Sequence, residues 1–337
     1  MKHYPKVLLH DHLDGGLRPE TIIEIADEIG YQGLPTKMSS KLADWFHEAA
    51  DSGTLERYLE TFNHTIAVMQ REKDIVRVAK EAVLDLAADG VIYAEVRVAP
   101  EHFTKKGLTM EAVTEAMLEG YRQGEVESGL KVNTILCGMR NFDKSQEVAE
   151  LVVKYRDKGV VSFDIAGPEK GYAPTLQKET FDYLRSKDIP FTIHAGEADG
   201  PNSIDQAVNI CGAKRIGHGV RIAEDLPNGR IAKQVLDEQI HLEVCPSSNL
   251  QTGVADIYSN HPIKELFELG YNIGINTDNR LMSHTSMSDE FEESAKAFGW
   301  GTAEFKELTL CAMNAAFIED KSPYLKQIEE RYDQFQR

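Results

Sequence analysis

The chain has 337 residues, of which 42% are hydrophobic and 27% are charged, proportions typical of a globular protein. Acidic residues number 55 against 37 basic residues, and the formal net charge is -18. This charge repels polyanions, so we expect neither nucleic acid nor an anionic membrane surface as a partner.

The sequence has no feature typical of a membrane or secreted protein. No stretch approaches the roughly 18 apolar residues of a membrane span, and residues 1–5 lead into a strand-like run without the apolar segment of a signal peptide. Four scattered cysteines without a C-x-x-C pair are typical of free thiols in a reducing compartment. We therefore expect a cytoplasmic protein.

Short apolar runs rich in β-branched residues alternate with amphipathic segments along most of the chain. The predicted strands cover residues 6–10, 91–96, 132–137, 160–165, 190–194, 215–219, 241–245 and 272–277. Several of these runs are almost continuously apolar, as expected of parallel strands buried on both faces. Eight strand–helix alternations predict an α/β fold, a closed (β/α)8 TIM barrel. An open doubly wound sheet is the alternative, but it gives no reason for the number eight.

The amphipathic segments between the strands predict helices. They cover residues 73–88, 110–125, 145–156, 175–186, 203–211, 231–237 and 263–269. Two further helical regions lie outside the alternation, one at about 18–72 after the first strand and one at about 286–335, which contains helical patterns at 302–318 and 323–332. Because no Pro/Ser-rich linker or internal repeat interrupts the chain, we expect one catalytic domain over residues 1–337.

Histidines and an aspartate occur where predicted strands end, which is where barrel enzymes carry their catalytic groups. The first strand ends in His10-Asp11-His12, and side chains at i and i+2 of an extended segment point to the same side. His194 ends the fifth strand, and Asp278 ends the eighth, which adjoins the first in a closed barrel. Three imidazoles, one carboxylate and a free position for water suit a catalytic Zn²⁺ ion.

Two further groups lie at the same end of the predicted barrel. Glu197 is three residues beyond His194, and His218 ends the sixth strand between two glycines. Zinc lowers the pKa of bound water from 15.7 to about 7, on the order of 12 kcal/mol, whereas general acid–base catalysis adds about 3–5 kcal/mol. We therefore expect metal-assisted hydrolysis with Glu197 and His218 transferring protons. The alternatives are a solvated loop carboxylate and a histidine bonded to backbone.

Four ordered motifs together resemble the adenosine deaminase family. They are LHDHLDG at 9–15, HAGE at 194–197, GHG at 217–219 and NTD at 276–278, supported by YAEVR at 93–97 and CPSSN at 245–249. The resemblance runs from about residue 6 to 320. It implies a hydrolase of purine salvage that converts adenosine, and also 2′-deoxyadenosine, to inosine and ammonia.

The resemblance also implies roles for individual residues. It implies one zinc ion per chain, bound by His10, His12, His194 and Asp278. It implies that Glu197 protonates the purine N1 and that His218 orients the attacking water and helps to deprotonate it. Protonation at N1 is chemically sensible because it relieves the charge that builds up in the ring.

Further resemblances imply contacts to a small-molecule nucleoside. Gly167 matches a glycine whose backbone amide contacts purine N3, and a glycine there allows a planar ring to approach closely. Asp14 matches a contact to a ribose hydroxyl. The segment 55–62 resembles a helix that caps the pocket. Its apolar residues follow the spacing of one helical face, which ordinary core packing would also explain: Leu55, Tyr58, Leu59 and Phe62.

The chain departs from the family after the last predicted ligand. Many members have a second aspartate followed by proline, whereas this chain has Asn279-Arg280. An asparagine amide can donate to purine N7 and accept from the exocyclic N6 amine, and it needs no proton to donate. Asn279 is therefore compatible with adenine recognition, and Arg280 in place of proline leaves the loop shape open.

Other classes of protein fit less well. Zinc deaminases that act on cytosine carry H-x-E and P-C-x-x-C motifs, which this chain lacks. Binuclear amidohydrolases have a carboxylated lysine where Asp164 stands, so one metal ion is favoured. Adenine deaminase, whose relatives tend to have glutamate where Asp14 stands, is the closest alternative. AMP deaminase needs a phosphate site, and the sequence has no clear basic cluster for one. An inactive nucleoside-binding protein is the alternative from a different class.

Overall fold

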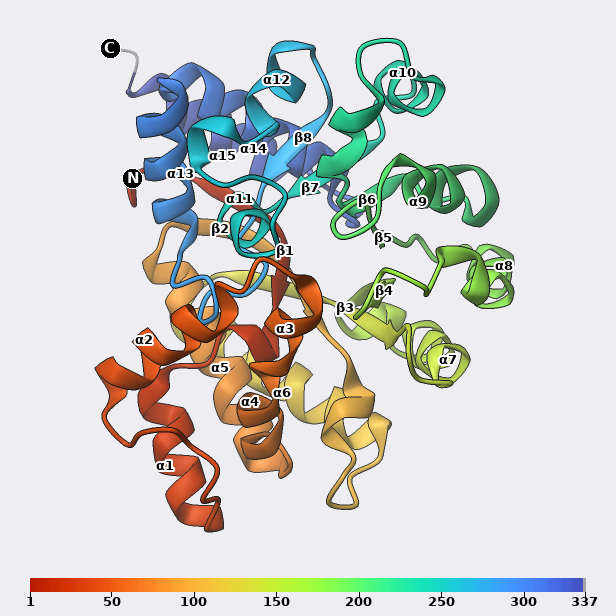
Figure 1. Ribbon diagram of the computed structural model, residues 1–337. Coiled ribbons are helices and arrows are strands. Elements are labelled where there is room, and N and C mark those ends of the chain that lie inside the picture. The colour runs from red at the N-terminus through yellow and green to blue at the C-terminus, as the bar shows by residue number, and fades with distance from the viewer. Residues whose placement is uncertain (336–337) are drawn as a thin grey trace.

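The computed structural model describes residues 1–335, in which eight strands alternate with helices along the chain (Figure 1). The strands are β1 (Lys6–His12), β2 (Val91–Val98), β3 (Lys131–Met139), β4 (Val160–Ala166), β5 (Ile193–Ala195), β6 (Arg215–His218), β7 (His241–Val244) and β8 (Ile273–Ile275). Each overlaps one predicted strand, so the strand predictions are confirmed. The largest shift is at β5, which begins three residues after Pro190, a residue with no N–H to donate to a neighbouring strand.

The strands form two parallel four-stranded sheets, β1–β4 and β5–β8, that meet at two seams. At the first seam Phe163 pairs with Phe191, and the backbone N–H of Thr192 donates to the carbonyl of Phe163 (3.1 Å). At the second seam Asp11 of β1 pairs with Asp278. One bridge on each side thus joins the two sheets, and the predicted (β/α)8 architecture is confirmed.

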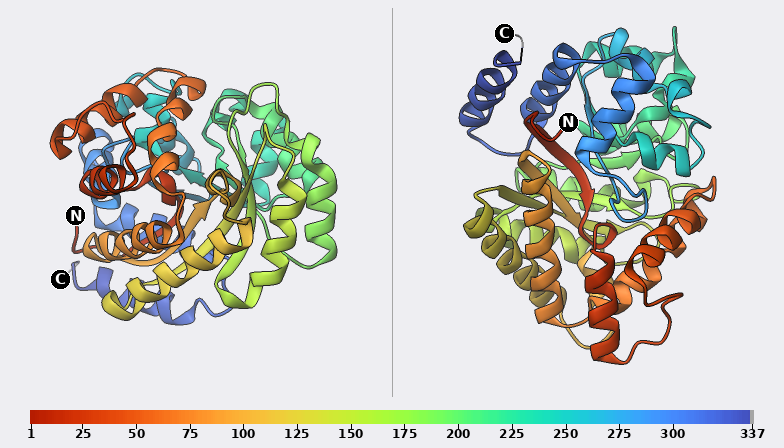
Figure 2. Two further views of the ribbon diagram at one scale, coloured as in Figure 1. Left: turned by 90° about the horizontal axis from the view of Figure 1, so that it is seen from below. Right: turned by 90° about the vertical axis from the view of Figure 1, so that its left-hand side faces the viewer.

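Helices lie around the outside of the strands. From residue 72 to 186 they follow one another in chain order (orange to green in Figure 2, left). The outer helices are α5 (Glu72–Ala88), α6 (Met110–Ser128), α7 (Ser145–Tyr155), α8 (Lys178–Ser186), α9 (Pro201–Asp205), α10 (Arg230–Asp237) and α12 (Ile263–Glu268). The short helix α11 (Pro246–Gln251) instead lies at the carboxyl ends of the strands. In α5 the buried side chains Ile75, Ala79 and Leu86 lie on one face, as the amphipathic pattern predicts. The helix predicted at 203–211 begins within α9, and its remainder, Gln206–Cys211, is π-helical.

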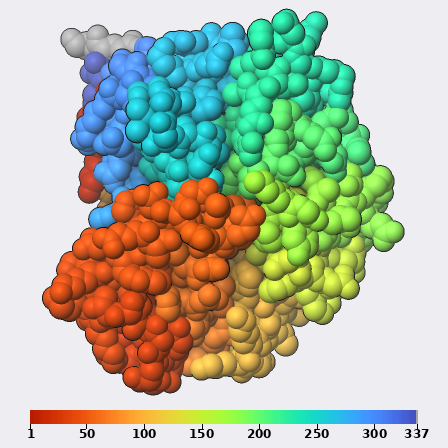
Figure 3. All heavy atoms as spheres, viewed as in Figure 1, coloured from red at the N-terminus to blue at the C-terminus, as the bar shows by residue number. Residues whose placement is uncertain are grey.

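The two additional helical regions are present where the sequence predicts them. After β1 come α1 (Pro19–Ile29), α2 (Ser39–Ala50), α3 (Leu55–Glu60) and α4 (Phe62–Val68). The surface of this region abuts the segment near residue 250 (Figure 3), where the Gly53 N–H donates to the carbonyl of Gln251 (2.9 Å). The C-terminal helices are α13 (Met287–Phe298), α14 (Thr302–Ala315) and α15 (Ser322–Asp333).

The prediction of a single domain is not tested by these observations and stays a prediction, and positions 336–337 lie outside the described residues. Within residues 1–335, no helix combines the length and apolar character needed to cross a bilayer.

Candidate active site

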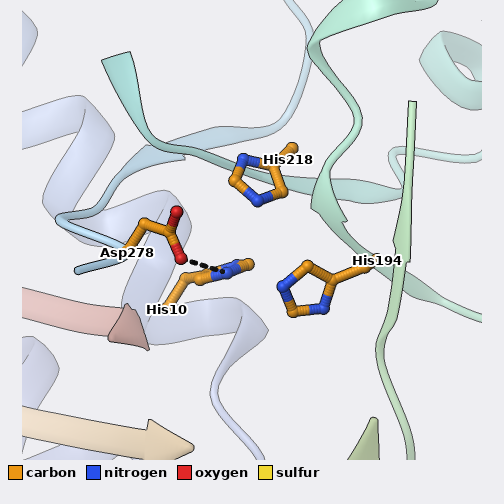
Figure 4. Close-up of side chains that lie close together, drawn as sticks. All are labelled: His10, His194, His218 and Asp278. Atoms are coloured by element: carbon orange, nitrogen blue, oxygen red, sulfur yellow. Dashed lines mark ion pairs between the residues drawn. The ribbon is translucent and has the colours of Figure 1, made fainter. Parts of the chain in front are cut away.

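The carboxyl ends of four strands bring histidines and an aspartate together. His10 and His12 end β1, His194 lies in β5, His218 ends β6 and Asp278 follows β8. Figure 4 shows His10, His194, His218 and Asp278 pointing toward one another, and one ligand atom from each lies within 4.8 Å of the others. All four are buried, so the cluster is a site that could hold a metal ion.

His12 lies in the same cluster, although the four-residue group above contains His218 and does not contain His12. Its Nε2 lies 3.4 Å from Oδ1 of Asp278 and 3.4 Å from Nε2 of His194. Nε2 of His10 is likewise 3.4 Å from Oδ1 of Asp278. Ligands about 2.0–2.1 Å from a tetrahedral ion are roughly 3.3 Å from one another, and these three distances between predicted ligands are close to that spacing.

The backbone explains how Asp278 reaches residues more than 260 positions earlier. Its N–H donates to the carbonyl of His10 (2.9 Å), and its carbonyl accepts from the N–H of His12 (2.7 Å). Asp278 and His218 both adopt left-handed backbone conformations, with φ of +58° and +59°. Such conformations are uncommon for non-glycine residues and cluster at functional sites, where the surrounding structure holds them.

A second layer of buried groups orients two of the imidazoles. Nδ1 of His10 lies 2.9 Å from Glu243, and Nδ1 of His194 lies 2.7 Å from Asp164. A carboxylate that accepts from Nδ1 leaves the Nε2 lone pair facing the metal position. Arg97 donates to both carboxylates, at 2.8 Å in the case of Asp164.

These buried ion pairs shift the pKa values of both carboxyl groups. Burial acts to raise the pKa of Asp164, but His194 and Arg97 outweigh it and hold that pKa below its usual value. Arg97 and Arg215 do the same for Glu243, holding its pKa well below the usual value against the effect of burial. Both groups therefore remain charged acceptors.

No role is predicted from the sequence for Glu243 or Arg97, and Asp164 is noted there only because it stands where binuclear amidohydrolases have a carboxylated lysine. The sequence does contain a sign that charged groups are buried here, because charged residues interrupt otherwise apolar strands at YAEVR and HLEV. Such charges are almost never buried without a partner. Their partners could not be identified from sequence because they lie on other strands.

The CPSSN motif after β7 contributes two more contacts that the sequence did not assign. Ser248 donates from Oγ to Oδ2 of Asp278 (2.6 Å), the oxygen other than the one near the imidazoles. The side-chain amide of Asn249 lies 3.1 Å from Nδ1 of His218, which leaves Nε2 of that ring toward the cavity. Both contacts orient predicted site residues.

Glu197 and His218 form a buried pair of titratable groups. Oε2 of Glu197 lies 3.6 Å from Nε2 of His218, and the two side chains are 5% and 1% exposed. Burial, followed by the nearby Asp278 and Glu169 carboxylates, raises the pKa of Glu197 well above its usual value. Burial also lowers the pKa of His218 well below its usual value. Both shifts favour the neutral forms, a protonated carboxyl group beside an uncharged imidazole.

A cavity of about 250 Å³ opens from this cluster. All seven residues that the sequence predicts as substrate contacts line it: Asp14, Gly167, Asn279, Leu55, Tyr58, Leu59 and Phe62. Further lining residues that the sequence analysis did not name are Asn63, Ile66, Ala99, His102, Lys105, Cys137, Met139, Asn141, Phe142, Ala166 and Pro168. Most of the latter lie at the ends of β2, β3 and β4 or in the loops that follow these strands.

The predicted capping helix at 55–62 differs in one respect. It is interrupted, with α3 ending at Glu60 and α4 beginning at Phe62, so its four apolar residues lie on two consecutive helices. The interruption coincides with Thr61, whose hydroxyl donates back to the carbonyl of Tyr58 (2.7 Å). Such side-chain bonds to the preceding turn bend helices.

Two of the predicted substrate contacts have distinctive surroundings. Gly167 has φ of +92°, a backbone conformation that favours glycine, and a Cβ there would lie 2.8 Å from the flexible end of the Met139 side chain. Asp14 is 4% exposed, and its burial raises the pKa of its carboxyl group to about 7.

Asn279 and Arg280 are the two residues at which the chain departs from the family pattern. Asn279 is 3% exposed, and its Oδ1 has no hydrogen-bond partner within residues 1–335. Arg280 turns away from the cavity to Asp11. The loop shape that the sequence left open is thus held by a buried ion pair in place of a proline.

A (β/α)8 barrel that gathers three imidazoles, a carboxylate and a buried acid–base pair at the carboxyl ends of its strands defines a metal-dependent hydrolase of the amidohydrolase type. Residues 5–331 match the family described as adenosine deaminase. The chain therefore belongs to the adenosine deaminase family and is a hydrolytic deaminase.

Relatives and solved structures agree with this assignment. Adenosine deaminase 1 of Streptomyces coelicolor is 54% identical over 331 residues, covering 94% of this chain and 84% of that protein. The adenosine deaminase of Mycobacteroides abscessus is 49% identical over 327 residues, covering 93% and 90%. The crystal structure of adenine deaminase from Arthrobacter aurescens superposes with a TM-score of 0.89 at 25% identity, covering 97% of this chain and 98% of that chain.

Proposed function

We propose that this protein catalyses the zinc-dependent hydrolytic deamination of adenosine, and also of 2′-deoxyadenosine, to the 6-oxopurine nucleoside and ammonia. The observation that carries the proposal is the 3.4 Å spacing of the predicted ligand atoms beside Glu197, at one end of a cavity of about 250 Å³. That volume lies below the range of about 300–1,000 Å³ for drug-sized ligands, which suits one small molecule.

The residues that would bind the ion are His10, His12, His194 and Asp278. Three nitrogen donors and one carboxylate oxygen suit Zn²⁺, and Ser248, Asp164 and Glu243 support them with hydrogen bonds. When bound, zinc supplies a hydroxide near neutral pH by lowering the pKa of water from 15.7 to about 7.

Glu197 and His218 would transfer the protons of the reaction. Protonation of the purine N1 by Glu197 makes C6 more electrophilic and neutralises the charge that develops in the ring during attack. His218 orients the attacking water and helps to deprotonate it. The new C6–O bond forms, the C6–N6 bond breaks, and the nitrogen leaves as ammonia after protonation.

The substrate would be held between the strand ends and helices α3 and α4. The backbone amide of Gly167 donates to N3, and Asp14 contacts a ribose hydroxyl. Asn279 faces the N7 and N6 edge, where an asparagine amide can donate to N7 and accept from the exocyclic amine. Leu55, Tyr58 and Phe62 exclude water from the base, which strengthens the polar contacts around it.

Adenine is the competing substrate, because a structurally similar protein is an adenine deaminase. Asp14 supports the nucleoside, since a short carboxyl group at this position leaves room for a ribose hydroxyl. AMP would need a phosphate site, and the sequence has no clear basic cluster for one. The intact acid–base pair also supports an enzyme rather than an inactive nucleoside-binding protein.

One set of measurements tests the proposal. Ammonia release is measured with adenosine, adenine and the 5′-phosphate, together with metal analysis of the purified protein. We expect adenosine to have the highest kcat/KM and zinc to be present at one equivalent per chain. A higher kcat/KM for adenine would show that adenine, rather than adenosine, is the preferred substrate. No ammonia release from any of the three compounds would favour a nucleoside-binding protein without activity.

The remaining proposals concern the protein in the cell. We propose that it forms a single domain and acts on its small-molecule substrate in the cytoplasm. The cysteines support the location, since all four are free and Cys137, Cys211 and Cys245 are buried.

A further inference from the structure

Glu169 lies in the loop that follows β4 and is 3% exposed. Five hydrogen-bond donors surround its carboxylate. Oε1 accepts from the N–H of Gly196 (2.7 Å) and from Oγ of Ser203 (2.6 Å). Oε2 accepts from the N–H groups of three successive residues, Glu197 (3.1 Å), Ala198 (2.7 Å) and Asp199 (2.8 Å). The side chain therefore holds the backbone on both sides of Glu197.

We propose that Glu169 is a positioning residue for Glu197, which it holds at the correct place for proton transfer to the purine. This inference rests on the proposed function. It concerns a residue that does not line the cavity and that binds the loop carrying Glu197.

The chemistry of the contact requires a carboxylate. All five partners donate, and an ionised carboxyl group is an acceptor with two oxygens and no proton. A glutamine of the same shape would direct its NH₂ group at backbone N–H groups that have no other acceptor nearby. Glutamine at position 169 therefore moves the loop or leaves buried donors without partners.

The loop is also held at its other end. Arg140, which is buried, donates to the carbonyl of His194 and to the carbonyl of Tyr172, in the same loop as Glu169. Between the two anchors Gly196 adopts φ of +74°, and a Cβ there would lie 2.5 Å from Ile204. Arg140 thus binds a backbone carbonyl and Glu169 binds backbone N–H groups of the same segment. Together they hold the chain from the predicted ligand His194 to Glu197.

Glu169 also joins two loops that contact the same ring of the substrate. Gly167, two residues before it, is the proposed contact to N3, and Glu197 is the proposed donor to N1. N1 and N3 belong to one six-membered ring and are separated by one carbon atom. By binding the 196–199 backbone, Glu169 sets the spacing between these two contacts.

The test compares Glu169→Gln with the wild-type zinc-loaded enzyme. We expect kcat on adenosine to fall about 100-fold, as for a misplacement of about 1 Å, with the zinc content unchanged. We also expect faster hydrogen exchange at the amides of residues 196–199. Glu179→Gln, the same change at an exposed position of α8, is the matched control and should leave both measurements unchanged. A kcat within about threefold of wild type would overturn the proposal.

A double-mutant cycle separates positioning from general stability. In a Glu197→Gln background, adding Glu169→Gln should lower the residual turnover by less than about threefold, because the group that it positions is already absent. A further loss equal to that in the wild-type background would mean a merely structural role and would overturn the proposal. If Glu169→Gln does not fold, Glu169→Asp replaces it, with an expected loss of about tenfold.

The two proposals fail in different ways. No ammonia release from adenosine by the wild-type protein would refute the proposed function. Unchanged exchange at residues 196–199 in the folded Glu169→Gln variant would refute the role of Glu169 whatever the substrate is.

Discussion

Arg280 donates from Nε to Oδ1 of Asp11 across 3.0 Å, and the two side chains are 10% and 0% exposed. Asp11 lies between His10 and His12, and the same oxygen accepts from Oγ1 of Thr277 (2.8 Å). The pair therefore joins the strand that carries two predicted ligands to the loop that carries the fourth. Arg280 stands where many family members have proline.

This ion pair predicts a strong effect on stability. Arg280→Met should lower the free energy of unfolding by about 3–5 kcal/mol, because it leaves a charged Asp11 buried without its partner. Adding Asp11→Leu should restore most of the loss, since no buried charge then remains. Urea unfolding of the three proteins checks this, and a loss below about 1 kcal/mol in the single variant would show that the pair is not needed.

Replacement of the proposed proton donor should separate catalysis from metal binding. We expect Glu197→Gln to retain its zinc while turnover on adenosine falls by roughly 10²–10⁴-fold, the range for loss of a general acid. Metal analysis and an ammonia-release assay on the same preparation check both parts. Near-normal turnover would remove Glu197 from the mechanism.

Replacement of a metal ligand and of the group behind it should have graded effects. His10→Ala should lose zinc and activity together, whereas Glu243→Gln should weaken zinc binding by about 10–100-fold, as for other outer-shell partners. Competition with a chelator measures both affinities. The exposed His3→Ala is the control, and zinc retention in His10→Ala would refute the ligand assignment.

Substitution of Asn279 should change how affinity depends on pH. The wild-type amide donates to N7 without a titrating proton, whereas an aspartate must be protonated to donate. In Asn279→Asp we therefore expect KM for adenosine to rise relative to wild type as the pH rises from 5 toward 8, well above the ordinary aspartate pKa of about 3.9. Asn279→Ala should raise KM at every pH. An unchanged KM in both variants would rule out recognition of the base by this residue.

Glu290 predicts a pH dependence of stability that is separate from the active site. It is buried on α13 and accepts from the hydroxyl groups of Tyr258 and Thr285. Burial raises the pKa of its carboxyl group from 4.5 to about 7. The folded protein thus binds the proton more tightly than the unfolded chain, and this stabilisation is complete below about pH 4.5 and is lost as the pH rises through about 7.

The measurement compares Glu290→Gln with wild type by urea unfolding between pH 4.5 and 8. The free energy of unfolding of the wild type should fall by roughly 3 kcal/mol relative to that of the variant across this interval. Glu292→Gln, an exposed change on the same helix, should follow the wild type. Parallel curves for wild type and Glu290→Gln would contradict the prediction.

The strands and the residues at their ends could be predicted because both depend on local patterns. Apolar runs of strand length and helical periodicity fix the order of elements, and the barrel then places His10, His194 and Asp278 at one end. The interruption at Thr61 was not predicted, because the apolar spacing continues across it and only a side-chain hydrogen bond marks it.

The hydrogen bonds and ion pairs that hold the site residues in place could not be predicted, because they join residues that are far apart in the chain. Arg97 meets Asp164 and Glu243 only when β2, β4 and β7 surround one interior. Glu169 lies in a loop without periodicity, and its five partners come from another loop. A single sequence shows which residues are charged but not which of them form ion pairs.

The seam between β1 and the segment after β8 has a consequence for biosynthesis. The backbone of Asp278 bonds directly to His10 and His12, so the last predicted ligand arrives by the same contacts that complete the ring of strands. A ribosome-bound chain that ends before residue 278 lacks that ligand, however well its earlier strands have folded. The predicted metal site is therefore complete only after the eighth strand has been synthesised. An ion held by His10, His12 and Asp278 would connect the first strand to the segment that follows the eighth.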